Sequence, residues 1–199
     1  SIKRGAPPRV QSSFYAFLII NKANLRRKKM IKNKEINLKK LVFASLLVCM
    51  GYVLNTFIWI PGMAPFQHFI NVTAAVFLGP AWAFLCALTI GLLRMIINGR
   101  TILALIGAIV GAFLSGILYK RFQKLYWAVI GEVIGTGIIS AILSYPFMRM
   151  FYGLPKGSVF MYIPLFVPSS VMGATVAVLL IKALKKTNTF DKIKAQLDK

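Results

Sequence analysis

The sequence predicts an all-α integral membrane protein with one compact six-helix domain. Hydrophobic residues make up 58% of the 199 residues, charged residues make up 15%, and the mean hydropathy is +0.72. A soluble domain is typically about half apolar and about a quarter charged. Charged residues are also sparse between Leu41 and Ile181, where apolar runs follow one another. These observations favour a polytopic membrane protein.

The formal net charge of +21 is a value that nucleic-acid-binding proteins also show. Most of the basic residues, however, precede Leu41 or follow Ile181, so they flank the apolar runs. An excess of Lys and Arg in cytoplasmic segments beside membrane spans explains this placement. We therefore expect the lipid bilayer as a partner and no nucleic acid.

The charge pattern also predicts the organisation of the chain. Residues 1–40 are expected to be a basic cytoplasmic tail, in which residues 1–29 are a candidate non-native extension because Met30 precedes the first coherent segment. Residues 41–183 are expected to form the six-helix membrane domain. Residues 184–199 are expected to be a polar tail, which places both termini in the cytoplasm.

The first two apolar runs differ in length. Residues 41–60 are long enough to span a membrane, and Trp59 is expected at the outer interface. Residues 61–65, bounded by prolines, are a candidate lid. Residues 65–79 contain an apolar run of only about 13 residues, whereas crossing a hydrocarbon core of ~30 Å takes about 20. They therefore predict a short second helix whose polar beginning lies inside the protein.

The third and fourth spans are expected at residues 82–97 and 102–119. Small residues recur in them at four-residue spacing, which predicts close packing of their helices. These residues are Ala83, Ala87 and Gly91 in the third span, and Ala104, Gly107, Ala108, Gly111, Ala112, Ser115 and Gly116 in the fourth.

The fifth span is expected at residues 125–148 and the sixth at 159–183. Polar residues follow at four-residue steps in the fifth span and form a stripe that turns slowly around an α-helix. They are Glu132, Thr136, Ser140 and Ser144. In the sixth span, Pro164 and Pro168 are expected to produce a kink.

Three predicted helices bring polar side chains to the same outer half of the domain. These candidate substrate-binding residues are Gln67, His68, Asn71, Arg94, Asn98, Ser144 and Tyr145. The aromatic residues Trp59, Phe66, Tyr145 and Tyr162 are candidates for flat apolar walls, as in small-molecule pockets. Structural alternatives remain open: His68 and Asn71 as hydrogen-bonding partners of neighbouring helices, and Arg94 as a side chain that snorkels to the interface.

Glu132 completes the candidate set. A rise of 1.5 Å per residue from Leu125 places it roughly 10 Å above the cytoplasmic edge, lower than the outer cluster. A carboxylate within the membrane is costly and indicates function by default. Three roles remain open: the floor of the pocket, an ion pair with Arg94, or a protonated group bonded to a backbone carbonyl.

The sequence favours a transport subunit over an enzyme, with no catalytic residue, metal or cofactor. It contains no G-x-x-x-x-G-K-[ST] phosphate loop, and one deep acidic residue is too few for a typical proton or sodium relay. An intramembrane hydrolase using His68 and Glu132 lacks a nucleophile, and the predicted difference in depth argues against it. A capture subunit powered by partner proteins fits these features.

Four blocks of the sequence resemble the ThiW family over most of residues 36–185. They are FQHFINVTAAVFLGP, GLLR, GAFLSGILY and GEVIGTGIISAILSYP. The resemblance implies a substrate-binding S component of an energy-coupling factor (ECF) transporter for the thiamine precursor hydroxyethylthiazole. It further implies a multi-pass protein of a prokaryotic plasma membrane, with a six-helix S-component fold and a lidded outer pocket. Its implied partners are a transmembrane T component and two ABC-type ATPases.

The chain departs from the family pattern in two respects. The Ala-x-x-x-Ala docking surface of S components has only Ala44 with Val48, or Ser45 with Cys49, as candidates here. Hydroxyethylthiazole is also neutral and needs no counter-ion from Arg94 or Glu132. Either these two residues pair or support the pocket, or the ligand is charged. The alternative function is an S component or stand-alone transporter for another small vitamin-like heterocycle.

Overall fold

The computed structural model describes residues 21–22, 38–58 and 60–198, so Trp59 lies outside the described residues. Residues 38–199 form one compact unit. Its helices follow in the order α2 (Leu38–Phe57), α3 (Pro65–Leu78), α4 (Pro80–Ile96), α5 (Leu103–Phe122), α6 (Leu125–Glu132), η1 (Val133–Ser140), α7 (Ala141–Tyr152), α8 (Ile163–Lys186) and α9 (Thr189–Leu197). The described residues contain no β-strand, and the predicted all-helical class is confirmed.

Within the described residues, four helical segments are long and apolar enough to cross a membrane. They are Leu38–Phe57, Leu103–Phe122, Leu125–Tyr152 and Ile163–Lys186. Helix α4 is apolar but has only 17 residues, and α3 has 14. At 1.5 Å per residue, α3 is about 21 Å long, which is shorter than the hydrocarbon core. The count of six spans and the cytoplasmic placement of both termini stay predictions.

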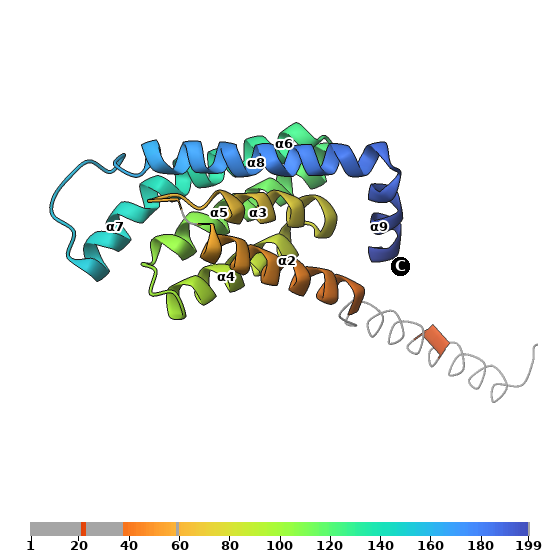
Figure 1. Ribbon diagram of the computed structural model, residues 1–199, viewed down its shortest axis with the longest axis horizontal. Helices are drawn as coiled ribbons and strands as arrows, with labels where there is room; N and C mark the ends of the chain where they lie inside the picture. Colours follow the sequence, from red (N-terminus) through yellow and green to blue (C-terminus); the bar gives the residue numbers. More distant parts are fainter. Residues whose placement is uncertain (1–20, 23–37, 59, 199) are drawn as a thin grey trace, which may run out of the picture. The chain divides into compact units, whose positions relative to one another are not determined.

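Helix α3 lies at the centre of the unit (Figure 1). Every residue of α3 except Phe66 is buried, and the helix contacts α2, α4, α5 and α8. A helix that is apolar on all sides is stable only when other helices surround it. The polar side chains at its beginning are consequently held inside protein.

Small residues bring the helices around α3 close together. A Cβ atom added at Gly91 of α4 would lie 3.1 Å from the Ala104 carbonyl oxygen and the Leu105 Cα atom of α5. A Cβ atom at Gly116 would collide with the backbone of Pro80. The close packing of α4 against α5 that the small-residue spacing predicted is therefore present.

The expected fifth span is one continuous helical segment with a π-helical middle, η1. All four residues of the predicted polar stripe are buried: Glu132, Thr136, Ser140 and Ser144. In an α-helix, four residues overshoot one turn by about 40°. The i→i+5 hydrogen bonds of a π-helix enlarge the turn, which offsets this drift. The π-helix thus keeps the polar stripe directed into the bundle.

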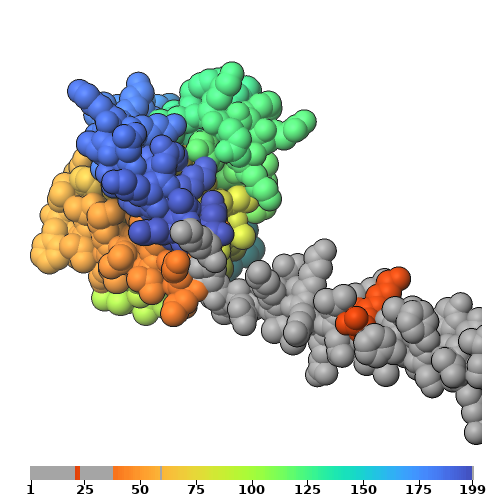
Figure 2. Space-filling model, turned by 90° about the vertical axis from the view of Figure 1, so that its right-hand side faces the viewer, coloured from red at the N-terminus to blue at the C-terminus, as the bar shows by residue number. Residues whose placement is uncertain are grey.

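Helix α8 begins at Ile163, later than the expected residue 159. Pro164 lies in its first turn, where a missing N–H removes no helical hydrogen bond, and Pro168 lies inside the helix. After α8, the expected polar tail contains α9, which folds across the end of the unit beside α2 (Figure 2). Phe190 of α9 is buried, and its ring centroid lies 5.0 Å from that of Phe77.

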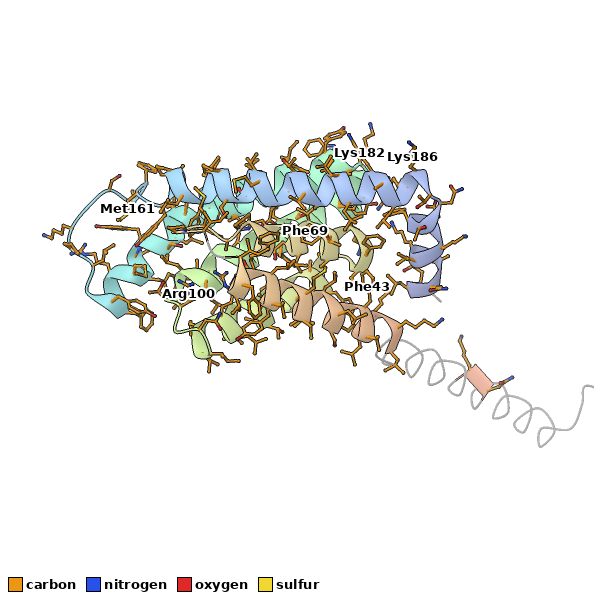
Figure 3. The ribbon with its side chains drawn as sticks, viewed as in Figure 1. Phe43, Phe69, Arg100, Met161, Lys182 and Lys186 are labelled. Carbon is orange, nitrogen blue, oxygen red and sulfur yellow. The ribbon has the colours of Figure 1, made fainter. Side chains whose placement is uncertain are left out.

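Basic residues lie at both ends of the unit. Lys182 and Lys186 lie toward the end that α9 covers, whereas Arg100 lies at the opposite end, where α4 connects to α5 (Figure 3). An ion pair of 3.2 Å between Lys40 Nζ and Asp198 Oδ1 also holds α2 near the end of the chain. The cavity described next opens at the Arg100 end.

Candidate substrate-binding site

A cavity of about 260 Å³ lies where α3 begins and α4 ends. Its lining residues come from the α2–α3 connection and the first turn of α3, from the end of α4, its connection to α5 and the beginning of α5, from η1 and from the first part of α8. A cavity of this volume suits a small organic molecule. The wall combines apolar side chains such as Leu103 and Phe166 with a few polar groups, as is typical of sites for small organic ligands.

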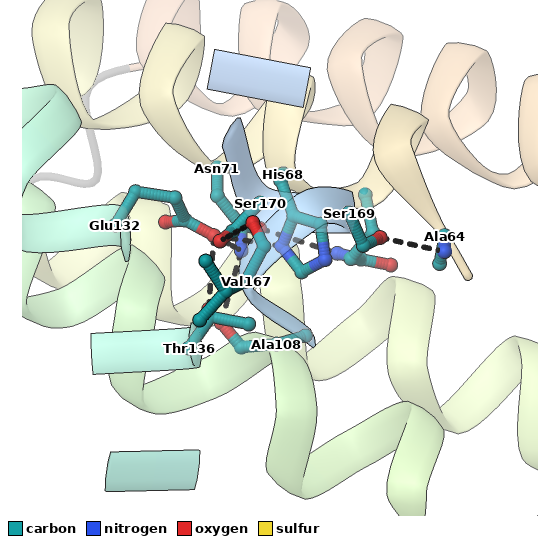
Figure 4. Close-up of polar contacts among 10 residues, drawn as sticks. Ala64, His68, Asn71, Ala108, Glu132, Thr136, Val167, Ser169 and Ser170 are labelled. Atoms are coloured by element: carbon teal, nitrogen blue, oxygen red, sulfur yellow. Dashed lines mark hydrogen bonds and ion pairs between the residues drawn. The ribbon is translucent and has the colours of Figure 1, made fainter. Parts of the chain in front are cut away.

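A buried hydrogen-bond network supports one side of the cavity (Figure 4). Glu132 Oε1 lies 2.8 Å from His68 Nδ1 and accepts hydrogen bonds from Asn71 Nδ2 (2.9 Å) and Thr136 Oγ1 (3.0 Å). Asn71 Nδ2 also donates to the Ala108 carbonyl oxygen at 3.0 Å. Glu132 is fully buried, and its Oε2 atom has no hydrogen-bond partner among the described residues. The network connects α3, α5, α6 and η1 through one carboxylate.

The orientation of His68 follows from the same contact. The donor and acceptor roles of His68 Nδ1 and Glu132 Oε1 depend on the tautomer of the imidazole ring. In the tautomer that carries the proton on Nδ1, this atom donates to Glu132, and Nε2, which points away from Glu132 (Figure 4), is an acceptor. His68 lines the cavity, whereas Glu132 does not.

The expected depth of Glu132 below the outer cluster is wrong. Its carboxylate is in hydrogen-bond contact with His68 and Asn71, two members of that cluster. The count from Leu125 gave the height of Glu132 on its own helix, but it did not give the relative depth of the first turns of α3, which carry His68 and Asn71. Among the described residues, no ion pair joins Glu132 to Arg94. The described residues also show no hydrogen bond from the Glu132 side chain to a backbone carbonyl.

The structure brings together only part of the predicted set. Gln67, His68 and Arg94 line the cavity, and Asn71 and Glu132 lie directly behind it. Arg94 is only 9% exposed, so it does not snorkel to the surface.

The remaining candidates lie elsewhere. Asn98 accepts a hydrogen bond from the Tyr52 hydroxyl at 2.7 Å and donates to Thr56 Oγ1 at 2.9 Å. Ser144 donates to the Ser140 carbonyl oxygen within its own helix. Tyr145 accepts a hydrogen bond from the Gly157 amide. None of the three predicted residues lines the cavity.

Two features of the cavity were not predicted as parts of the site. The aromatic wall is Phe166, whereas Phe66, Tyr145 and Tyr162 do not line the cavity. Ser169 Oγ accepts a hydrogen bond from the Ala64 amide at 2.9 Å, which holds the expected lid segment against α8. Phe166 and Ser169 are three residues apart, so they lie on one face of a helix. This spacing was the sequence feature that could have indicated that both residues line the cavity.

The sequence model described as "Thiamine-precursor transporter protein (ThiW)" matches residues 41–187. The chain belongs to the ThiW family. Neither the curated proteins nor the solved structures compared with the chain gave a match. The family match includes the whole cavity and its supporting network, while α9 follows it. The chain is therefore a membrane protein of a transporter family, and its cavity is the candidate precursor site.

Gly111 leaves room for the side chains of Glu132 and Thr136 behind the cavity of the ThiW chain. A Cβ atom at Gly111 would collide with Thr136 Oγ1 and lie 3.0 Å from both oxygens of Glu132. We expect Gly111→Ala to reduce the free energy of unfolding by about 1–3 kcal/mol through overpacking. Thermal unfolding of the purified protein in detergent would measure this change.

Gly157→Ala is the matched control, because the atom nearest to its added Cβ is 3.9 Å away. Equal stability of the Gly111→Ala variant and the unmodified protein would contradict the tight packing around Glu132.

Proposed function

We propose that this chain is the substrate-capture S component of an ECF-type importer, and that it binds hydroxyethylthiazole or a related thiamine precursor in the cavity. The single observation that carries the proposal is the small cavity beside a histidine that a buried carboxylate orients. The thiazole ring would pack against Phe166, and a polar substituent would bond to His68 Nε2. The cavity would open to the outside, with both chain termini in the cytoplasm.

The proposed partners are a transmembrane T component and two ABC ATPase subunits. On α2, Ser45 and Cys49 are exposed, whereas Ala44 is buried at 6% exposure. This difference favours the Ser45–Cys49 pair over Ala44–Val48 as the small-residue surface for docking. Copurification with the T component and ATPases tests the assembly, and bulky substitutions at Ser45 and Cys49 should reduce it.

Ligand identification tests the function most directly. Mass spectrometry of the small molecule that copurifies with the protein should detect a thiazole, and uptake of labelled thiazole should stop when the ATPases are inactivated. Uptake that persists without ATPase activity would instead indicate a stand-alone transporter. Copurification of a different heterocycle would exclude hydroxyethylthiazole as the substrate.

A variant of His68 provides a quantitative prediction. We expect His68→Ala to weaken thiazole binding by about 10- to 100-fold, because the loss of a buried hydrogen bond costs about 1–3 kcal/mol. Isothermal titration calorimetry would measure the affinity. Ser144→Ala is the control outside the cavity and should retain the affinity of the unmodified protein. Unchanged binding by the His68→Ala variant would remove His68 from the site.

A further inference from the structure

Arg94 is a buried cation in the wall of the cavity, and its side chain has no partner among the residues that the structure describes. It lies in the last turn of α4, lines the cavity and is only 9% exposed. Within the part of the chain that the structure describes, its guanidinium group makes no hydrogen bond or ion pair. Burial of an unpaired charge is costly, and buried charged groups are normally paired or hydrogen-bonded. The position of Arg94 thus indicates a missing anionic partner.

The carboxylates of the described residues do not supply this partner. Glu132 accepts hydrogen bonds from Asn71 and Thr136 and is bonded to His68. Asp191 and Asp198 belong to or follow α9, at the end of the unit away from the cavity. No acidic residue is among the described residues that line the cavity. A negative charge near Arg94 would therefore have to come with the ligand.

A second guanidinium group increases the positive charge of the same wall. Arg100 also lines the cavity, and its backbone amide donates to the Arg94 carbonyl oxygen at 3.1 Å. This hydrogen bond keeps the two residues on one short segment. Thr101, the next residue, adds a hydroxyl donor to the wall. Two cations and a hydroxyl on one side match the chemistry of an oxyanion.

We propose that Arg94 binds an oxyanion of the transported ligand, either a carboxylate or a phosphate monoester carried by a small heterocycle. This proposal rests on the proposed function and specifies its substrate class as acidic derivatives of the precursor. The guanidinium fork bonds two oxygens of such a group, and Arg100 adds electrostatic attraction. The heterocycle occupies the apolar part of the cavity beside Phe166.

Three probes test the proposal on the full-length protein in nanodiscs: hydroxyethylthiazole, its phosphate monoester, and the analogue in which a carboxymethyl group replaces the hydroxyethyl group. Calorimetry should show that at least one acid binds tenfold or more tightly than the neutral alcohol. The comparison of the two acids distinguishes a phosphate ligand from a carboxylate ligand.

Two variants assign the effect to Arg94. Arg94→Gln should weaken binding of the preferred acid by about 100-fold and binding of the alcohol by less than threefold. Arg94→Lys should give an intermediate affinity, because it retains the charge and loses the fork. Without ligand, Arg94→Gln should unfold at the same temperature as the unmodified protein or a higher one, because an unpaired buried charge is removed.

The outcomes separate this proposal from the proposed function. Tighter binding of the alcohol than of both acids, or an equal effect of Arg94→Gln on all three probes, would overturn the oxyanion site and leave precursor binding intact. Failure of all three probes to bind would overturn both. If the Arg94→Gln variant does not fold, the three affinities of the unmodified protein and of the Arg94→Lys variant decide the result.

Discussion

Replacement of Glu132 by leucine is expected to reduce the free energy of unfolding by about 2–5 kcal/mol. The fully buried carboxylate accepts hydrogen bonds from Asn71 of α3 and Thr136 of η1, and it contacts His68 Nδ1 of α3. Leucine fills a similar volume but leaves these donors without their acceptor. Each buried polar group that loses its partner costs about 1–3 kcal/mol, and Asn71 retains its bond to the Ala108 carbonyl oxygen.

Glu132→Gln separates stability from binding in the same experiment. Glutamine keeps one side-chain oxygen as an acceptor, so it should destabilise the fold by only about 1 kcal/mol. It should still weaken ligand binding by about tenfold, because the carboxyl group that contacts His68 Nδ1 is lost. Thermal unfolding and calorimetry of both variants measure the two effects.

Ser140→Ala is the matched control for these variants. Ser140 is fully buried in the same polar stripe, but its Oγ atom has no hydrogen-bond partner among the described residues. Its removal should change the stability by less than 1 kcal/mol. Equal effects of Ser140→Ala and Glu132→Leu would contradict the central role of the carboxylate.

Gly173→Ala is expected to separate α8 from α3 and to abolish ligand binding. A Cβ atom at Gly173 would collide with the Pro65 carbonyl oxygen and lie 2.8 Å from His68 Cβ and from the Phe69 amide nitrogen. Backbone atoms of a fully surrounded helix cannot move aside, so the cost should exceed the ~1–3 kcal/mol of ordinary overpacking. The movement of α8 would also carry Phe166 out of the cavity wall.

Gly51→Ala provides the comparison for Gly173→Ala. Its added Cβ would meet only side-chain atoms, with Ile90 Cδ1 at 2.7 Å and Ile70 Cγ1 at 2.9 Å. These side chains can adjust, so a smaller loss of stability is expected. Detergent-solubilised yield and thermal unfolding measure both variants, and calorimetry measures binding. A Gly173→Ala variant that remains stable and binds ligand would exclude the close α3–α8 contact.

Much of the site could be predicted because some polar residues occur where the surrounding sequence is apolar. The short run after Pro65 placed Gln67, His68 and Asn71 inside the protein, and the structure locates them at the cavity or directly behind it. Arg94 was predicted from its position at the end of an apolar helix. Asn98, Ser144 and Tyr145 were included by the same reasoning, but helix rotation directs them to other partners.

The sequence by itself determined the all-helical class, the short α3 helix, the close packing of small residues and membership of the ThiW family. Composition and spacing suffice for the first three features because each depends on residues near one another in the chain, whereas family membership rests on the match of whole sequence blocks.

Only the tertiary structure decided that Glu132 contacts His68, that Phe166 forms the aromatic wall and that Arg94 has no partner within the described part of the chain. These contacts depend on the relative depth and rotation of separate helices. A π-helical segment changes the rotation of the residues that follow it, and the periodicity of one segment does not show this change.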